Sequence, residues 1–536
     1  MISLLLALAV PVLAAEPSLL RSRPTAALVD EVIELKPAEG HHFNVEAPQK
    51  CGGDKPVELL PRRVRCQPGR PGKYAILVSV CDDALTFCKQ ETFDVQVTGV
   101  SKAAAKASPM AAPPKETRKG PDGFLTDPAA AVAQAKKEKK LLFIDFYGIW
   151  CPPCNDLDEH AYPTAEFQAE APNFVRLALD ADAASSFDLK TRFKVGGYPT
   201  LIIADADLRE IDRVVGFRSG TALVQFMMSA YAHKDEPIED AAKADAAAGQ
   251  RVNVLRRLRV ARWRVDRGEP ALAEPLLTGI AYPPARKALL EARRERARLE
   301  DDAPAGLAAL KELVEKFPDE ADFSDWASSL ADADPAAARP YEDAVRRSVD
   351  RWSQDPGLGS AGYDAGDLYA NLGSFLDAVG STGTAKAAWS KAADAYERQA
   401  RRSRLPMPRA ANFGRADALM KAGRAEEAAK LYAALVKAYP KEFTFNYDYA
   451  TQLSEKDPAA AYPYAVQAAA SAYGDNWLRA VRLQASLELK LKRPRDAVKT
   501  LDEALAQAAP PKSTAVRTVR YLAALRELRA KAAAAR

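Results

Sequence analysis

Two cysteines, Cys151 and Cys154, are separated by two prolines and closely follow a mostly apolar run, Leu141–Tyr147. A short apolar run of this length is typical of a buried strand, and the residues after the cysteine pair favour a helix. The segment therefore predicts a strand–turn–helix unit with both cysteines at the start of the helix. Of all features in the sequence, this one constrains the fold most, because it fixes where a strand ends and a helix begins.

The start of a helix also determines the chemistry of the first cysteine. Unpaired backbone N–H groups and the helix dipole favour a negative charge at that position. Such surroundings lower a cysteine pKa from about 8.5 to between roughly 3.5 and 7.5. We therefore expect Cys151 to be the nucleophile and Cys154, one helical turn later, to resolve the mixed disulfide. The alternatives are a static disulfide or half of a zinc site, although no second Cys or His pair follows nearby.

Helix-like and strand-like segments alternate between residues 124 and 233, which predicts a compact α/β domain. The cysteine pair lies inside this domain, after its first strand. The expected helices are residues 128–140 and 223–233, and the expected strands are residues 141–147, 174–180, 199–205 and 211–217.

Three features of this domain resemble the thioredoxin family in order and spacing. Trp150–Cys154 reads Trp-Cys-Pro-Pro-Cys where the family has Trp-Cys-Gly-Pro-Cys, and Asp145 matches the buried acid of the family. Gly196–Thr200 reads Gly-Gly-Tyr-Pro-Thr and looks like the cis-proline loop. The resemblance implies a thioredoxin fold and a redox-active disulfide. We expect neither an organic cofactor nor a metal, since no glycine-rich phosphate loop follows a strand.

The resemblance also implies roles for single residues. Asp145 would accept the proton of Cys154, because a carboxylate on a buried strand has its pKa raised by desolvation; the alternative is an acid that only bonds locally. Pro199 would follow a cis peptide bond, and the backbone of Tyr198 would dock the client chain. Trp150 belongs to the same expected client-binding surface.

The remaining four cysteines lie in residues 24–98, where apolar residues alternate with a period of two. This pattern predicts a small β-sandwich domain. Their spacing is unlike a zinc site and favours disulfides, for which three pairings are possible. We favour Cys81 with Cys88 and Cys51 with Cys66.

Residues 1–15 form an apolar stretch that is too short to span a bilayer and resembles an export signal, although it lacks a basic residue. An oxidising compartment would let the disulfides persist, so we expect a periplasmic or secreted protein with no stable membrane span. The alternative is a cytosolic thioredoxin with repeats. Residues 99–123 are rich in Ala, Pro and Lys and predict a semi-rigid linker.

The rest of the chain, residues 250–536, is rich in Ala, Leu, Arg and Glu and predicts an all-helical region. An offset of 34 residues, the length of a tetratricopeptide unit, superposes Tyr439 on Tyr473 and Ala416 on Ala450. The expected architecture is a tetratricopeptide-like solenoid whose concave surface binds a protein partner. An Ala-rich helical bundle is the alternative.

The combination of a β-domain carrying Cys81 and Cys88 with a thioredoxin-like domain resembles the extracytoplasmic parts of DsbD-type thiol:disulfide interchange proteins, without their membrane domain. The resemblance implies client proteins with disulfides and an electron donor. Cys81 and Cys88 would then either exchange with Cys151 and Cys154 or form a structural staple.

These features predict an exported thiol:disulfide oxidoreductase of the reductase or isomerase type, whose helical repeats recruit a client or partner. The alternative is a chaperone-like scaffold in which the thioredoxin-like domain is only a docking element. A net charge of +4 over 536 residues gives no general electrostatic reason to bind nucleic acid.

Overall fold

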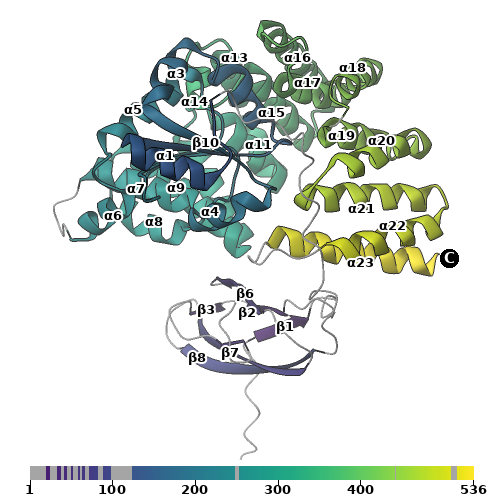
Figure 1. The fold of residues 1–536 in the computed structure, drawn as a ribbon, viewed down its shortest axis with the longest axis horizontal. Coiled ribbons are helices and arrows are strands. Elements are labelled where there is room, and N and C mark those ends of the chain that lie inside the picture. The colour runs from purple at the N-terminus through teal and green to yellow at the C-terminus, as the bar shows by residue number, and fades with distance from the viewer. Residues whose placement is uncertain are drawn as a thin grey trace, which may run out of the picture. The chain divides into compact units, whose positions relative to one another are not determined.

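The computed structural model describes residues 20–24, 33–37, 41–44, 50–51, 58–60, 63–66, 72–82, 88–97, 123–247, 253–440, 442–508 and 516–535. The predicted export signal and nearly all of the predicted linker lie outside these residues. The chain divides into two compact units, Met1–Lys102 and Ala103–Arg536 (Figure 1).

The first unit contains two antiparallel sheets, so the predicted β-structure is present there. One sheet has the order β1-β2-β6-β5, and in the other β7 pairs with β3, β4 and β8. Side chains from both sheets share one apolar core. The strands are β1 (Leu20–Pro24), β2 (Ile33–Pro37), β3 (His41–Phe43), β4 (Lys50–Cys51), β5 (Glu58–Leu60), β6 (Arg63–Cys66), β7 (Gly72–Asp82) and β8 (Cys88–Val97).

The second unit begins with an α/β domain built on a four-stranded sheet of order β10-β9-β11-β12. β10 runs parallel to β9, whereas β11 is antiparallel to both β9 and β12. The sheet agrees with the strands predicted from the sequence. Its elements are α1 (Pro128–Glu138), β9 (Leu141–Tyr147), α2 (Pro152–Asp156), η2 (Leu157–Ala161), α3 (Ala165–Glu170), η3 (Ala171–Asn173), β10 (Phe174–Asp180), η4 (Ala184–Ser186), α4 (Phe187–Arg192), β11 (Thr200–Ala204), β12 (Glu210–Val215) and α5 (Gly220–Ala232).

The two faces of β9 carry different side chains because successive residues of a strand point to opposite sides. Leu142 and Ile144 pack with α1 and α4 on one face. Phe143 packs with η2, α3 and α5 on the other. Asp145 shares the face of Phe143, so the acid lies on the side where the chain continues into the cysteine segment.

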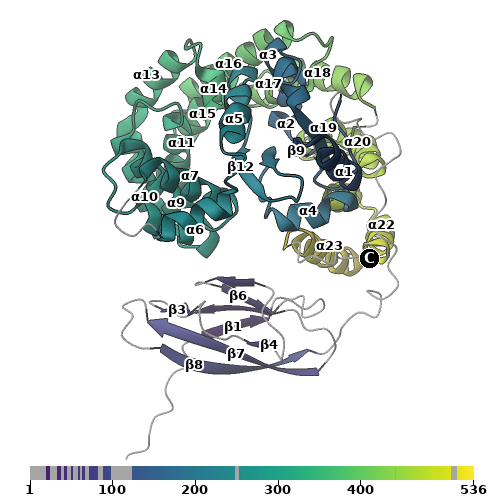
Figure 2. The ribbon, with the colours of Figure 1, turned by 60° about the vertical axis from the view of Figure 1, so that its left-hand side comes forward.

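The remainder of the second unit is helical, as the sequence predicts, and Figure 2 shows these helices curving around the α/β domain. Within the described ranges, none of the helices has both the length and the hydropathy needed to cross a bilayer. The helices are α6 (Ile238–Ala247), α7 (Val254–Asp266), α8 (Pro270–Leu277), α9 (Pro283–Glu300), α10 (Ala303–Lys316), α11 (Phe323–Ala333), α12 (Pro335–Ala338), η5 (Arg339–Tyr341), α13 (Glu342–Trp352), α14 (Leu358–Ala361), α15 (Ala365–Ala378), α16 (Thr382–Arg402), α17 (Arg409–Lys421), α18 (Ala425–Ala438), α19 (Phe443–Leu453), α20 (Pro458–Ser471), α21 (Gly474–Lys490), α22 (Pro494–Gln507) and α23 (Val516–Ala534).

The first member of the residue pairs that the 34-residue offset superposes, Ala416, lies in α17, which forms a helical pair with α18. Gly423 lies between the two helices with a φ of 81°, a left-handed conformation that glycine adopts without steric cost. The next pair, α19 and α20, begins 34 residues after the first, which matches the period seen in the sequence. Tyr432 is buried in this region, so it belongs to the core.

A carboxylate of the α/β domain caps one of these helices. Helix α17 has no side-chain cap of its own, because Pro408 occupies its N-cap position. Glu159, from η2, accepts hydrogen bonds from the backbone N–H groups of Arg409 at 2.9 Å and Ala410 at 3.2 Å, and from Arg409 Nε at 3.3 Å. The buried carboxylate thereby provides acceptors for the free backbone N–H groups at the start of α17, and it joins the α/β domain to the helical region.

Glu159→Gln should destabilise the protein by about 1 to 3 kcal/mol, because it removes a buried, charge-assisted helix cap. Guanidinium unfolding of the purified variant measures the loss. The control is Glu166→Gln on exposed α3, which should leave the midpoint unchanged. Equal midpoints for both variants would contradict the capping role.

Further contacts to the α/β domain come from helices spread along the repeat region. Lys194 forms an ion pair with Glu269, which precedes α8. The α/β domain therefore covers part of the concave surface of the helical region, where the sequence predicts that a partner binds (Figure 2). Additional hydrogen bonds join Arg259 to Ile211, Ser219 to Gly359 and Gln399 to Asp156.

One buried acid of α19 makes the stability of the protein depend on pH. Burial raises the pKa of Asp448 to about 7, with Asp417 adding to the shift and Arg479 opposing it. One Asp448 oxygen is enclosed without a hydrogen-bond partner among the described residues. Between about pH 4 and pH 7 the folded state therefore holds a proton that the unfolded chain has lost, so stability falls as the pH rises.

Asp448→Asn should remove this pH dependence. Relative to the wild type, the variant should gain about 2 kcal/mol or more between pH 5 and pH 8, since one pKa unit corresponds to about 1.4 kcal/mol. Denaturant midpoints at both pH values test the prediction, with exposed Asp332→Asn as the control. A constant difference between Asp448→Asn and the wild type would contradict it.

Candidate functional site

The two cysteines lie where the sequence predicts them, between the end of β9 and the start of α2. Cys151 is the N-cap residue of α2, and its sulfur accepts a hydrogen bond from the backbone N–H of Cys154 at 3.2 Å. The two residues form a disulfide with a Cα–Cα distance of 5.2 Å. Only 3% of Cys151 and 2% of Cys154 is exposed, so access to the sulfurs is restricted.

The backbone around Cys151 leaves few donors for its sulfur. Pro152 and Pro153 occupy the first two helical positions and have no N–H group. The first available donor is therefore Cys154, the residue that bonds the sulfur. When the disulfide is reduced, this N–H is positioned to stabilise a thiolate on Cys151.

Pro152→Gly should lower the thiolate pKa of Cys151 and make the couple more oxidising, because it adds a backbone N–H near the sulfur. Equilibration of both proteins with glutathione measures the difference in potential. Pro275→Gly, inside helix α8, is the control for the replacement of a proline and should leave the potential unchanged. A wild type more oxidising than Pro152→Gly would contradict the prediction.

Two aromatic residues flank the disulfide, and one of them, Tyr198, precedes the predicted cis-proline. The Tyr198–Pro199 peptide bond is cis. The rings of Trp150 and Tyr198 meet edge to face with centroids 5.7 Å apart, and both pack against the cluster that contains the two cysteines. The structure thus places Trp150 and Tyr198 beside the cysteine pair, and Pro199 follows Tyr198 through the predicted cis bond.

Asp145 is 2% exposed and lies on β9, two residues before Tyr147, which belongs to the same cluster as the cysteines. Both residues lie on one face of the strand. The hydroxyl of Tyr162 donates a hydrogen bond to Asp145 Oδ2 at 2.9 Å. Tyr162 is itself buried and its ring packs against those of Phe143 and Phe167.

Several polar residues around the cysteine loop were not predicted from the sequence. Asp180 is the last residue of β10 and Asp182 lies just after it. Trp150 Nε1 donates a hydrogen bond to Asp182 Oδ2 at 2.6 Å. Because β9 and β10 are parallel, their carboxyl ends meet at one sheet edge, and this signal was available from the sequence. Tyr473 and Asn476, which bond the two acids, come from the helical region and left no such signal.

The cysteines of the first unit form a separate group. Cys51 is disulfide-bonded to Cys66, with a Cα–Cα distance of 5.5 Å, and the bond links the two N-terminal sheets. Cys81 is also a disulfide cysteine and lies opposite Cys88 in the register of β7 and β8. In the part of the chain that the structure describes, no cluster of His, Cys, Asp or Glu is arranged to hold a metal ion.

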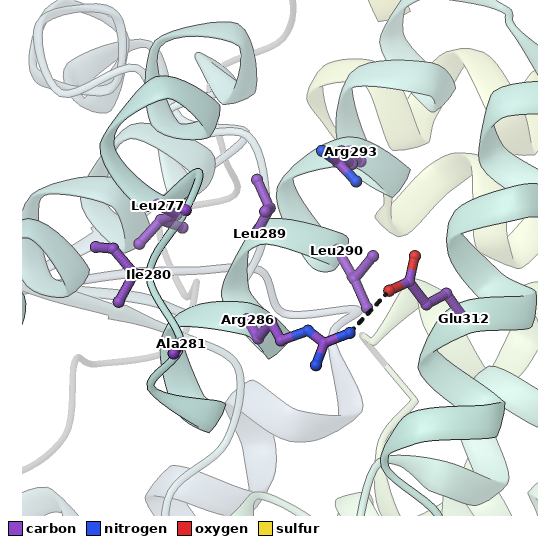
Figure 3. Close-up of a pocket in the computed structure, with 9 residues that line it drawn as sticks. Leu277, Ile280, Ala281, Arg286, Leu289, Leu290, Arg293 and Glu312 are labelled. Carbon is purple, nitrogen blue, oxygen red and sulfur yellow. Dashed lines mark ion pairs between the residues drawn. The ribbon is translucent and has the colours of Figure 1, made fainter.

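A pocket of about 330 Å³ lies in the helical region, between the end of α8, α9 and α10 (Figure 3). Arg286 and Glu312 form an ion pair across it at 3.5 Å. Arg293 and apolar side chains such as Leu277 complete the lining. No residue of the cysteine site lines this pocket, so it is distinct from the redox centre.

Comparisons with known proteins agree with this geometry. Residues 128–229 match the thioredoxin family model and form a thioredoxin domain. Thiol:disulfide interchange protein DsbD of Cronobacter sakazakii is 36% identical over 96 residues, 17% of this chain and 16% of that protein. The protein of the same name from Pseudoalteromonas atlantica is 27% identical over 130 residues, 24% of this chain and 21% of that protein. The chain therefore matches only about a fifth of the length of these curated relatives.

A solved structure of the APC/C hetero-tetramer Cut9-Hcn1 covers 58% of this chain and 77% of its own, at 13% identity and a TM-score of 0.21. A likeness of that size carries no argument about the function of the chain. The repeat character of the helical region therefore depends on its sequence period and its helical pairs.

Proposed function

We propose that this chain is a thiol:disulfide oxidoreductase that reduces or isomerises disulfides of client proteins through Cys151 and Cys154. The observation that carries the proposal is the position of Cys151 at the N-terminus of α2 in a thioredoxin domain, with Trp150 and the cis bond before Pro199 beside it. The names of the similar proteins, thiol:disulfide interchange proteins, point to the same class of reaction.

The first step is nucleophilic attack by the reduced form of the pair. The Cys151 thiolate attacks one sulfur of the client disulfide, and the other client sulfur leaves as a thiolate that takes up a proton. Trp150 and Tyr198 flank the attacking sulfur, and the backbone at Tyr198 docks the client chain. The product of this step is a mixed disulfide between Cys151 and the client.

The second step releases the client. Asp145 accepts the proton of Cys154, and the resulting thiolate attacks the sulfur of Cys151. The Cys151–Cys154 disulfide forms, and the second client sulfur leaves as a thiolate. The enzyme is oxidised and the client reduced by two electrons, so a dithiol reductant must return the pair to the reduced state before the next turnover.

The helical region supplies the partner-binding part of this proposal. Tetratricopeptide-like repeats bind peptides and proteins and seldom catalyse reactions. A tethered module of this kind raises the local concentration of a client beside the cysteines. A client would bind to the part of the helical surface that does not contact the thioredoxin domain.

Export and the N-terminal sandwich belong to the proposal as well. Disulfides such as Cys51–Cys66 persist in oxidising compartments, which supports a periplasmic or secreted location. The apolar core shared by the two N-terminal sheets supports a β-sandwich. Whether Cys81 and Cys88 exchange with the pair or act as a staple is tested by trapping: a covalent adduct of Cys151 with either cysteine in a Cys154→Ala variant would support exchange.

A scaffold is the second candidate, because the helices bond the thioredoxin domain at several points, as a docking element would require. Reduction of insulin by dithiothreitol separates the two candidates. The wild type should accelerate insulin precipitation, whereas Cys151→Ser should match the uncatalysed rate. Equal rates with both proteins would favour the scaffold.

A further inference from the structure

The orientation of Trp150 depends on a carboxylate that the helical region also holds. Trp150 Nε1 donates a hydrogen bond to Asp182 Oδ2 at 2.6 Å. Nδ2 of Asn476, near the start of α21, donates to the same oxygen at 2.5 Å. The two donors therefore share one acceptor, and the indole next to Cys151 is linked to a residue 294 positions beyond Asp182.

A second bond fixes the same turn of the thioredoxin domain. The hydroxyl of Tyr473, the residue before α21, donates to Asp180 Oδ2. Asp180 Oδ1 in turn accepts a hydrogen bond from the backbone N–H of Asp182 at 3.0 Å. Both acids of the turn are thus bonded by one short segment, Tyr473–Asn476.

Both residues of the helical region that make these hydrogen bonds are buried. Tyr473 is 3% exposed and Asn476 is 1% exposed. Burial and the neighbouring Asp180 carboxylate raise the pKa of Tyr473, so its hydroxyl stays protonated and remains a donor. The two carboxylates are half-buried, and such a group that loses a donor is left partly desolvated, so the segment and the turn stabilise each other's positions.

The backbone of the segment is shaped for this approach. Gly474 has a φ of 59°, and a Cβ atom on it would lie 2.8 Å from Asp182 Cβ and 3.1 Å from the carbonyl oxygen of Asp182. Any other residue at this position would push α21 away from the turn. The close fit therefore requires glycine.

Apolar contacts extend the same interface to the cysteine loop. Ile149 and Trp150 pack against a cluster formed by Phe443 in α19, Ala468 in α20 and Ala480 in α21. The helical region thus contacts the loop that carries Cys151 through both its indole ring and the residue before that ring. A client that reaches Cys151 would therefore pass close to helices α19, α20 and α21.

We propose that the segment Tyr473–Asn476, at the start of α21, is an integral part of the redox site, in which Asn476 and Tyr473 are positioning residues that hold the indole of Trp150 through Asp182 and its turn. The proposal rests on the proposed disulfide exchange for its consequence in turnover. Its consequence for the accessibility of Cys151 does not require turnover.

The test uses the full chain with Asn476→Ala, alone and combined with Trp150→Phe. Loss of the Asn476 donor should loosen the indole and raise KM for a peptide disulfide at least about fivefold, with kcat changed less. In the reduced protein, alkylation of Cys151 by iodoacetamide should become roughly threefold faster, because the indole covers the sulfur less tightly. Arg482→Ala, at an exposed position on the same helix, is the control and should change neither value.

The double variant separates positioning from general stability. If Asn476 acts through the indole, Asn476→Ala should have no further effect in the Trp150→Phe background. An equal effect in both backgrounds, or an Asn476→Ala protein that behaves like Arg482→Ala, would overturn the proposal. A wild type that reduces no disulfide would contradict the proposed function alone, because the alkylation rates still decide this inference.

Gly474→Ala supplies an independent variant, since it disturbs the interface through the backbone instead of the hydrogen bond. It should speed alkylation of Cys151 at least as much as Asn476→Ala. Gly383→Ala is its control, because glycine 383 lies in α16 with no atom within 4 Å of an added Cβ. An unchanged alkylation rate in Gly474→Ala would count against the proposal.

Discussion

Replacing Cys154 with Ser should abolish turnover and trap the client on the protein. Cys151 keeps its position at the N-terminus of α2, so the first attack on a client disulfide proceeds. Without the Cys154 sulfur, the mixed disulfide has no internal nucleophile to resolve it. We expect insulin reduction to fall about a thousandfold, to the uncatalysed rate, while a covalent adduct accumulates. Non-reducing electrophoresis and mass spectrometry of the adduct measure this outcome.

Two controls make the trapping experiment specific. The Cys151→Ser, Cys154→Ser double variant should form no adduct, because the nucleophile is gone. A variant with both Cys51 and Cys66 replaced by Ala should reduce insulin at the wild-type rate, since that disulfide belongs to the other compact unit. An adduct attached at Cys51 or Cys66 in the Cys154→Ser protein, with none at Cys151, would contradict the assigned roles.

Asp145→Asn should slow the resolving step by about a hundredfold at neutral pH, the scale of general-base catalysis. Asp145 is buried on the face of β9 that leads to the cysteine cluster, and the amide that replaces it cannot accept the proton of Cys154. The mixed disulfide should therefore accumulate during single turnover. Quenched-flow trapping with acid, followed by mass spectrometry, measures its lifetime.

The pH dependence of this variant gives an internal check. At alkaline pH hydroxide increasingly removes the Cys154 proton without help from Asp145, so the rate of Asp145→Asn should approach that of the wild type as the pH rises. The control is Asp188→Asn at an exposed position of α4, which should match the wild type at every pH. A variant that releases its client at the wild-type rate near pH 7 would remove Asp145 from the mechanism.

The local elements of the thioredoxin domain could be predicted because each depends on a short stretch of sequence. The apolar run at Leu141–Tyr147 forms β9, and the two prolines after Cys151 begin α2. The position of a residue within such a unit follows from strand alternation and helix capping. The cysteine pair, Trp150 and Tyr198 therefore came together as the sequence indicated.

The partners of this site on the helical region could not be predicted, because a repeat pattern identifies equivalent positions without fixing their contacts. The offset of 34 residues equates Tyr439 with Tyr473. In the structure the hydroxyl of Tyr439 bonds the carbonyl oxygen of Met407, whereas that of Tyr473 bonds Asp180. Equivalent tyrosines thus hold different parts of the molecule, and only the three-dimensional curvature of the helices decides which.

The cap of helix α17 could not be predicted from the sequence either. The sequence shows Pro408 before the helix and gives no capping residue nearby. The cap is Glu159, which comes from the thioredoxin domain. A local search for capping residues cannot find a partner that is 250 residues away.

The role of Cys151 as the nucleophile is tested most directly by the pH dependence of its alkylation in the reduced protein, with Cys151→Ser as the reference for all other thiols. If Cys151 is the activated nucleophile, it should react as a thiolate with an apparent pKa below the value of about 8.5 for a free cysteine. A pKa at or above that value, or no reaction at Cys151 under conditions that alkylate a control peptide, would contradict it.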